Sequence, residues 1–395
     1  MKVVMIGQKG IPAKSGGIEK HVEGLALELK RQGHEVIVYT RPYYISKNIK
    51  KFSGINLINI PSLKTKHFDA ASHTLLATLH AIFKIKDLDI IHYHGIGPSL
   101  FIPLARILKP TAKIISTFHC QDYYHQKWSL MARLFLRLGE FSSVYFPHKT
   151  IVVSKTLKKY VNQKYHRSVT YIPNAVQLGN DKISNKKTLK ILKKWELKPS
   201  EYIITVNRLV RHKGIHTLIK AFKKLDSETQ KKRKLVIVGD PVFTEDYEKE
   251  IKALAKNNKN IIFAGQQTGE SLGALFANAY IYVHPSESEG LSLSLLEALS
   301  HKLPLLVSDI PANMEVIKGL GFCFKNKDQE SLYQQLSYML SLPENKLKKI
   351  GLLGQKMVTN DYNWEVVAKK TEKIYKKTRL CFQPRILFRF KTKEA

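Results

Sequence analysis

The chain has 395 residues, of which 44% are hydrophobic and 10% aromatic, a composition that excludes a disordered or low-complexity protein. Its length suits two domains of ordinary size rather than a single core. The apolar run after Met1 is too short for a signal peptide, and no run reaches the roughly 18 apolar residues of a spanning helix. Three widely separated cysteines favour a reducing compartment and offer no zinc-binding spacing.

The charge balance is strongly basic. Lys and Arg number 65 against 32 Asp and Glu, a net charge of +33, which favours polyanionic partners such as nucleic acid, phosphorylated ligands or an anionic leaflet. The excess is spread along the chain, since residues up to Arg167 contribute 26 basic and 9 acidic side chains, or +17, and the rest +16. No nucleic-acid-binding signature accompanies it, so we expect no nucleic acid partner.

Short apolar runs alternate with helical patterns through the first half. Val3 to Ile6 predicts a strand, and Gly33 ends the helix that follows. Further predicted strands are Glu35–Tyr39, Ile55–Ile60, Ile90–Tyr93, Lys113–Phe118, Thr150–Val153 and Thr170–Ile172. Repeated strand–helix–strand units build a parallel sheet, so this half predicts a Rossmann-like domain.

The second half begins the same alternation again. Its predicted strands are Tyr202–Val206, Lys234–Val238, Ile261–Ala264, Ala279–Val283 and Leu305–Val307, with helices at Ile215–Leu225 and Tyr247–Asn257. The stretch from Pro173 to Ile183 is aperiodic and contains Pro, Gly and Asn, which is typical of a linker. The fold class predicted is therefore α/β, with two doubly wound parallel-sheet domains facing across a cleft.

A glycine-rich turn, Gly7 to Gly17, joins the first strand to the first helix. Glycines allow a ligand to approach the backbone, and the free N–H groups of a helix start attract an anion. The spacing fits neither the dinucleotide fingerprint nor the P-loop, which disfavours a dehydrogenase or an ATPase. The alternative is a tight turn in which Ser15 caps the helix.

A basic segment, Asn207 to Gly214, follows a predicted strand and precedes a helix. Open α/β sheets bind ligands beyond the carboxyl ends of their strands. Arg208 and Lys213 are suited to hold a diphosphate and to neutralise it as a leaving group without a metal. A solvated basic loop is the alternative interpretation.

The segment from Pro285 to Ala298 combines a strand end, a loop with Gly290 and the start of a helix near Ser294. Glu289 and Glu297 are eight residues apart, and carboxylates at such a place can bind sugar hydroxyls while the helix N–H groups bind phosphate. A capping box of Ser294 and Glu297 is the alternative for the second carboxylate. Glu289 has no comparable local explanation.

Three histidines lie on or after predicted strands. His119 follows a strongly apolar strand, where a first-domain side chain would meet the cleft, although a lone histidine is often structural. His92 and His94 alternate along another strand, and no third ligand with recognisable metal spacing accompanies them. We therefore interpret them as pocket or packing residues and predict no metal site.

Together these segments resemble glycosyltransferase family 4, a retaining family of GT-B fold, over essentially the whole chain. The family's glycine-rich first turn resembles Gly7–Gly17, its R-x4-K-G element matches Arg208–Gly214, and its E-x7-E element matches Glu289–Glu297. Val153-Ser154-Lys155, Ile172-Pro173-Asn174 and Asn363-Trp364 also look like family landmarks. Residues 10–12 and 16–19 resemble a subgroup with bacterial rhamnosyl- and glucosyltransferases of surface-polysaccharide assembly.

The resemblance implies a role for each matching residue. Arg208 and Lys213 would bind the donor diphosphate, Glu297 the ribose and Glu289 the transferred sugar. His119 would lie beside the reacting centre. The remaining donor-site residues implied are Gly16, Gly17, Gly290, Leu291, Leu293 and Ser294. Many relatives carry aromatic-glycine where this chain has Leu291-Ser292, so their donor preference does not transfer.

The same resemblance implies a metal-independent enzyme without cofactor, with an acceptor-binding domain over residues 1–175, a nucleotide-sugar-binding domain over 182–365 and a tail over 366–395 that packs back on the first domain. We expect transfer of a glucose- or rhamnose-type sugar from a UDP- or dTDP-sugar to a polyprenyl-diphosphate-linked saccharide, in capsule, O-antigen or cell-wall synthesis. The alternatives are a nucleotide-sugar epimerase of the same fold and a basic nucleic-acid-binding protein.

Two basic and aromatic segments predict contact with an anionic membrane. Between Tyr123 and Lys149 a helical apolar face includes Leu130, Leu134 and Leu138, which suits an interfacial helix. Core packing of that face is the alternative. The second segment runs from Arg379 to Lys391, and both favour peripheral attachment of a cytoplasmic protein to the inner face of the cell membrane.

Overall fold

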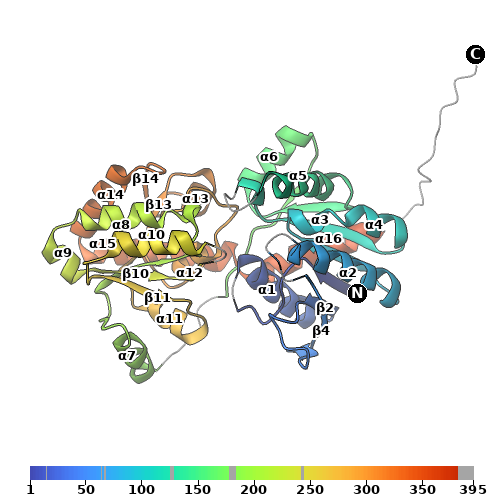
Figure 1. The fold of residues 1–395 in the computed structure, drawn as a ribbon, viewed down its shortest axis with the longest axis horizontal. Coiled ribbons are helices and arrows are strands. Elements are labelled where there is room, and N and C mark those ends of the chain that lie inside the picture. Colours follow the sequence, from blue (N-terminus) through green and yellow to red (C-terminus); the bar gives the residue numbers. More distant parts are fainter. Residues whose placement is uncertain are drawn as a thin grey trace, which may run out of the picture.

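The computed structural model describes residues 1–14, 16–63, 65, 68–124, 129–177, 184–241 and 244–380. Its strands form two separate sheets, one from each half of the sequence, with helices packed around both (Figure 1). We call the first sheet with its helices the first lobe and the second the second lobe. The two α/β units predicted from the alternation of apolar runs are confirmed.

The first sheet has the strand order β3-β4-β2-β1-β5-β6-β7-β8. Its strands are β1 (Lys2–Ile6), β2 (Glu35–Thr40), β3 (Lys51–Phe52), β4 (Ile55–Asn59), β5 (Ile90–His94), β6 (Lys113–Phe118), β7 (Lys149–Val152) and β8 (Thr170–Tyr171). All described pairings are parallel except that of β3 with β4. The order reverses at β1, between β2 and β5, and ligands of such sheets bind beyond this point.

The second sheet has the order β11-β10-β9-β12-β13-β14 and is parallel in its described pairings. Its strands are β9 (Tyr202–Val206), β10 (Lys234–Val238), β11 (Ile261–Gly265), β12 (Ile281–His284), β13 (Leu305–Ser308) and β14 (Phe322–Phe324). Here the order reverses between β9 and β12. The loops after these two strands contain the basic and acidic segments that the sequence analysis selected.

Sixteen α-helices are described. They are α1 (Gly17–Arg31), α2 (Asp69–Lys84), α3 (Ile96–Ser99), α4 (Ile102–Leu108), α5 (Leu130–Tyr145), α6 (Lys155–Tyr165), α7 (Asn185–Lys193), α8 (Ile215–Lys223), α9 (Ser227–Lys232), α10 (Glu245–Ala255), α11 (Gly269–Ala277), α12 (Leu293–Ser300), α13 (Pro311–Ile317), α14 (Gln329–Ser341), α15 (Glu344–Asp361) and α16 (Trp364–Leu380). Two short 3₁₀ helices are η1 (Asp122–Tyr124) and η2 (Arg211–Lys213). In the part of the chain so described, none of the helices is long and apolar enough to cross a membrane.

Several central strands of the two sheets are buried along their whole length. β5 and β6 are buried at every position, as is β12, because helices cover both faces of these parallel sheets. The predicted strands match the observed ones within one or two residues. Two strands that the sequence did not predict, β3 and β14, have only two and three residues and give no periodic signal.

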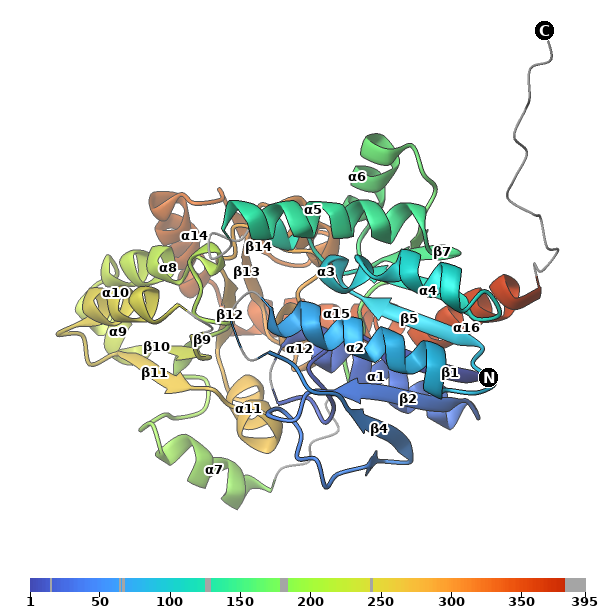
Figure 2. The same ribbon diagram turned by 45° about the vertical axis from the view of Figure 1, so that its right-hand side comes forward.

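The last helix, α16, returns to the first lobe (Figures 1 and 2). Its Trp364 packs against α1 at Gly24, where any Cβ atom would overlap the indole ring. Val367 and Tyr375 are fully buried in the first lobe's core. The chain therefore crosses between the lobes twice, and the crossings touch, since Val176 donates its backbone N–H to Tyr362 O at 2.9 Å. The predicted linker lies at this crossing, but its residues 178–183 are outside the described residues.

Candidate active site

Two loops of the second lobe meet at the carboxyl ends of β9 and β12. Lys213 from the first loop forms an ion pair with Glu289 from the second, and both side chains are only 10% exposed. Glu287 N donates to His212 O at 2.8 Å. Gly214 has a φ of 65°, and a Cβ there would overlap the carbonyl oxygen of Pro285, so the approach of the loops requires glycine.

The Glu289 carboxylate is held by a chain of polar side chains. His284 Nε2 lies 3.0 Å from Glu289 Oε1, and His284 Nδ1 lies 3.0 Å from the hydroxyl of Tyr282. That hydroxyl in turn donates to Ser294 Oγ at 3.0 Å. Burial alone would raise the pKa of Glu289, but Lys213 and His284 hold this pKa well below its ordinary value. Glu289 is therefore a buried carboxylate.

Helix α12 begins at Leu293, after the N-cap residue Ser292. The alternative interpretation, a capping box of Ser294 and Glu297, is wrong, because Ser294 is already inside the helix and Ser292 makes no side-chain capping bond. Instead the Ser294 hydroxyl contacts Tyr282 and, at 3.1 Å, the hydroxyl of Ser292. Glu297 lies past the first turn rather than in it, and its partner comes from the first lobe.

An ion pair joins the lobes across this helix. Lys20 Nζ, from the first turn of α1, contacts Glu297 Oε1, and their side chains are 35% and 20% exposed. The other carboxylate oxygen, Oε2, is buried and has no hydrogen-bond partner among the described residues. Lys20 thus contacts the carboxylate that the resemblance assigns to the nucleotide ribose.

Two of the predicted glycines, Gly290 and Gly17, lie where the lobes touch, and Gly16 is next to Gly17. A Cβ atom at Gly290 would overlap the carbonyl oxygen of His119 in the other lobe. Gly17 faces Leu293, whose Cδ1 would lie 3.8 Å from a Cβ at that position. Gly16, with a φ of 101°, precedes α1, and Glu19 folds back over it to accept a hydrogen bond from Lys9 N at 3.0 Å.

Asn174 and Leu291 also connect the lobes. The Asn174 side-chain amide donates to Leu291 O at 2.9 Å. The structure thus brings His119, Gly17 and Lys20 of the first lobe to Gly290, Leu293 and Glu297 of the second. Because each of these contacts joins the two lobes, the predicted site residues gather along one boundary.

Arg208 differs from its predicted partner Lys213. Its side chain is exposed and forms no ion pair with any residue in the described ranges. Burial raises the pKa of the Cys120 thiol well above its usual range, and the charge of Arg208 is close enough to oppose that effect. Arg208 therefore lies near the residue that follows His119, on the side of the loop that faces the first lobe.

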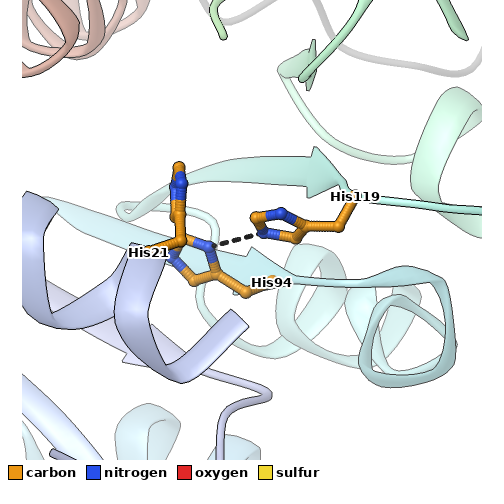
Figure 3. A group of neighbouring side chains, drawn as sticks. All are labelled: His21, His94 and His119. Atoms are coloured by element: carbon orange, nitrogen blue, oxygen red, sulfur yellow. Dashed lines mark hydrogen bonds between the residues drawn. The ribbon is translucent and has the colours of Figure 1, made fainter. Parts of the chain in front are cut away.

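His119 is the first residue after β6 and belongs to a cluster of buried histidines (Figure 3). His94 Nδ1 lies 3.4 Å from His119 Nε2, and the ring of His21 from α1 stands 4.7 Å from that of His119. Burial lowers the pKa of His21 to about 4 and those of His94 and His119 well below the usual value. All three are neutral imidazoles at neutral pH.

His92 behaves as a packing residue, as predicted. Its Nδ1 lies 2.6 Å from the Tyr375 hydroxyl and its Nε2 lies 2.7 Å from Thr117 Oγ1. Sequence reasoning missed Lys20 and His21, which follow the glycine pair directly in Gly16–His21. The available signal was their position near the start of a helix that follows a predicted ligand-binding turn.

Comparison with known families covers both lobes. Residues 15–180 match the model described as Glycosyltransferase Family 4, and residues 188–357 match the model described as Glycosyl transferases group 1. The chain belongs to glycosyltransferase family 4. It is therefore a transferase, and the resemblance inferred from three separate sequence motifs is confirmed.

Curated relatives align along nearly the full length. The chain is 26% identical to an uncharacterized glycosyltransferase of Methanocaldococcus jannaschii, over 95% of this chain and 98% of the relative. It is 24% identical to the O-antigen chain mannosyltransferase B of Escherichia coli, over 84% and 91%. Identity to the alpha-monoglucosyldiacylglycerol synthase of Acholeplasma laidlawii is 26%, over 95% and 96%.

Solved structures share the arrangement of both lobes. The sucrose-phosphate synthase of Thermosynechococcus elongatus superposes with a TM-score of 0.79 at 19% identity, over 95% of this chain and 98% of that one. Anabaena HepE in complex with UDP and glucose gives 0.77 at 17% identity, over 95% and 100%. This chain therefore has the GT-B fold, as predicted.

The ion pair between Lys20 and Glu297 yields a test. If the nucleotide ribose needs Glu297, it competes with Lys20, so Lys20→Met should tighten binding of nucleoside diphosphates by about two- to fivefold, the range expected for a partly exposed ion pair. Isothermal titration calorimetry measures this, with Lys30→Met at the far end of α1 as the control. Weaker binding by Lys20→Met would contradict the competition.

Proposed function

We propose that this glycosyltransferase transfers a hexose or deoxyhexose from a UDP- or dTDP-sugar, with retention of configuration, to a lipid-linked saccharide at a membrane surface. The observation that carries this proposal is the meeting of Lys213, Glu289 and the start of α12 at the reversal point of the second sheet. The product would enter capsule, O-antigen or cell-wall polysaccharide. The names of the O-antigen chain mannosyltransferase B and the alpha-monoglucosyldiacylglycerol synthase support a role in the synthesis of surface polysaccharides or glycolipids.

The donor is proposed to bind in the second lobe beside α12. Backbone N–H groups at Leu293 and Ser294 belong to the first turn of that helix, where such groups lack intrahelical partners and favour phosphate oxygens. Arg208 and Lys213 add positive charge from the neighbouring loop. The complexes of HepE with UDP and glucose give the same class of ligand for a protein of this fold.

The sugar and ribose are proposed to bind the two carboxylates. Glu289 stays ionised, so it can accept hydrogen bonds from sugar hydroxyls. Glu297 Oε2 is buried without a partner in the described part of the chain, and a ribose hydroxyl would satisfy it. Gly290, Leu291 and Gly16–Gly17 would border the sugar where the lobes meet, with His119 across from them.

The proposed chemistry depends on stabilising the leaving diphosphate. In a retaining reaction on one face of the sugar, the departing phosphate helps to deprotonate the acceptor, so the protein must stabilise the charge that develops on it. Arg208 is suited to this task because its guanidinium is exposed and has no ion-pair partner among the described residues. The proposed mechanism needs neither a metal nor a cofactor.

Helix α5 is proposed to rest on the membrane. Its apolar side chains are exposed: Leu130 82%, Met131 67%, Leu134 53%, Phe135 52%, Leu138 49% and Phe141 45%. The predicted alternative, core packing of this face, is wrong for Leu130, Leu134 and Leu138. Arg133 and Arg137 lie on the same helix and suit anionic headgroups. The second predicted segment runs from Arg379 to Lys391, and its residues after Leu380 lie outside the described residues.

Alanine substitutions of Arg208 and Lys213 should distinguish an effect on turnover from an effect on stability. Arg208→Ala should lower turnover at least about a hundredfold and leave the melting temperature within about 2 °C, because Arg208 has no structural partner. Lys213→Ala should lower both, since it leaves the buried Glu289 unpaired. Steady-state assays and thermal melts measure these effects, with the exposed Lys220→Ala of α8 as control. Near-normal turnover in both variants would remove the mechanism.

The donor class can be identified without the acceptor. A ligand at about 100 times its Kd stabilises a protein by about 2.7 kcal/mol, so a matching nucleoside diphosphate should raise the melting temperature by several degrees in a thermal-shift screen. UDP, dTDP and their sugar conjugates should raise the melting temperature more than ADP and GDP do. A protein that responds to none of them would contradict a nucleotide-sugar donor.

Membrane docking through α5 predicts that acidic side chains on its apolar face weaken binding to the membrane. The double substitution Leu134→Asp and Phe135→Asp should reduce sedimentation with anionic liposomes at least about tenfold, since each side chain contributes roughly 1.5 kcal/mol or more on burial. The control is Leu352→Asp with Leu353→Asp, an exposed pair on α15 in the other lobe. Equal losses in both variants, or equal binding to neutral vesicles, would argue against docking through α5.

A further inference from the structure

Three buried histidines from three different elements converge beside the boundary between the lobes (Figure 3). They are His21 on α1, His94 at the end of β5 and His119 directly after β6. One nitrogen from each can be chosen so that all three lie within 4.8 Å of one another. No sequence pattern connects the three residues, because they are far apart along the chain.

The distances approach those of a metal site. Zinc binds imidazole nitrogens at about 2.0–2.1 Å in tetrahedral geometry, which places two such nitrogens roughly 3.3–3.4 Å apart. His94 Nδ1 and His119 Nε2 are 3.4 Å apart. His21 needs a small rotation or shift to complete the set. His92 cannot join without losing contacts, since Tyr375 and Thr117 engage both of its nitrogens.

The cluster has a nitrogen atom without a partner. His21 Nδ1 is buried and makes no hydrogen bond to any described residue, although buried polar atoms normally have a partner. Imidazole nitrogens are the commonest metal ligands in proteins.

Neighbouring side chains pack against two of the rings. The His92 ring lies 4.1 Å from that of His94. Asn174 lies beside His21. Imidazole ligands alone suit zinc, copper or nickel and disfavour magnesium and calcium.

We propose that His21, His94 and His119 form a binding site for a divalent transition metal of the zinc type. Three protein ligands leave the fourth position to water or a substrate oxygen. A bound ion would use the lone pair of His119, the residue proposed to lie beside the reacting sugar. Metal binding would therefore inhibit transfer. The binding site stands by itself, whereas the inhibition rests on the proposed function.

Binding can be measured without any substrate. The full chain should bind one equivalent of Zn²⁺ in calorimetry, and Co²⁺ should acquire the visible absorption of a four-coordinate ion. His94→Ala and His21→Ala should each weaken binding at least about a hundredfold, because a lost ligand costs no less than a lost outer group. The control is His73→Ala, since His73 is also buried and neither of its nitrogens has a partner.

The outcomes decide the two parts separately. No saturable binding by the folded wild-type chain, or equal binding by His94→Ala, His21→Ala and His73→Ala, would overturn the metal site. With an active donor, saturating Zn²⁺ should reduce turnover at least about tenfold, and a chelator should restore it. Unchanged turnover while one ion is bound would overturn the inhibition and leave the site. A chain that binds Zn²⁺ but never transfers sugar would count against the proposed function only.

Discussion

The buried ion pair between Lys213 and Glu289 fixes the geometry on which the candidate site depends. A carboxylate at this depth is stable only while its cation is in place, and removal of either partner from a buried pair costs about 3–5 kcal/mol. The pair joins the loops after β9 and β12, which are far apart in the sequence. Gly214 permits their close approach, and His284 and Tyr282 extend the contact to α12.

This arrangement gives different roles to Lys213 and Arg208, whose positive charges look equivalent in the sequence. Lys213 forms an ion pair with Glu289, so it contributes to the internal structure of the site as well as to its charge. Arg208 stays exposed, without an ion pair to any described residue, so its charge remains available to a phosphate. The difference follows from position: Lys213 lies in η2, under the second loop, whereas Arg208 lies two residues beyond the end of β9.

Much of the fold and half of the site could be predicted from the sequence. Buried parallel strands leave continuous apolar runs, so β5, β6 and β9 were recognisable, and ligand-binding loops follow strand ends by geometry. The partner of Glu297 was not predictable, because the local pattern with Ser294 suggested a cap while the actual partner, Lys20, is 277 residues away. A sequence pattern carries no information on which distant lysine reaches a carboxylate.

The histidine cluster and α5 illustrate the same limit. His21, His94 and His119 meet only because the reversal of strand order places α1, β5 and β6 side by side. For α5, helical periodicity predicted an apolar face correctly, but periodicity does not say whether another element covers it. Only the packing shows that Leu134 and Leu138 face outward.

The return of α16 to the first lobe has a consequence for the order in which the protein can be made. Residues of α16 fill the core beside α1, yet they follow the whole second lobe in the sequence. At about 5–20 residues per second, the ribosome needs roughly 10–40 s to reach them after β8 is complete. During that interval the groove around Gly24 lacks Trp364, so the nascent first lobe exposes apolar surface that a chaperone can recognise until synthesis ends.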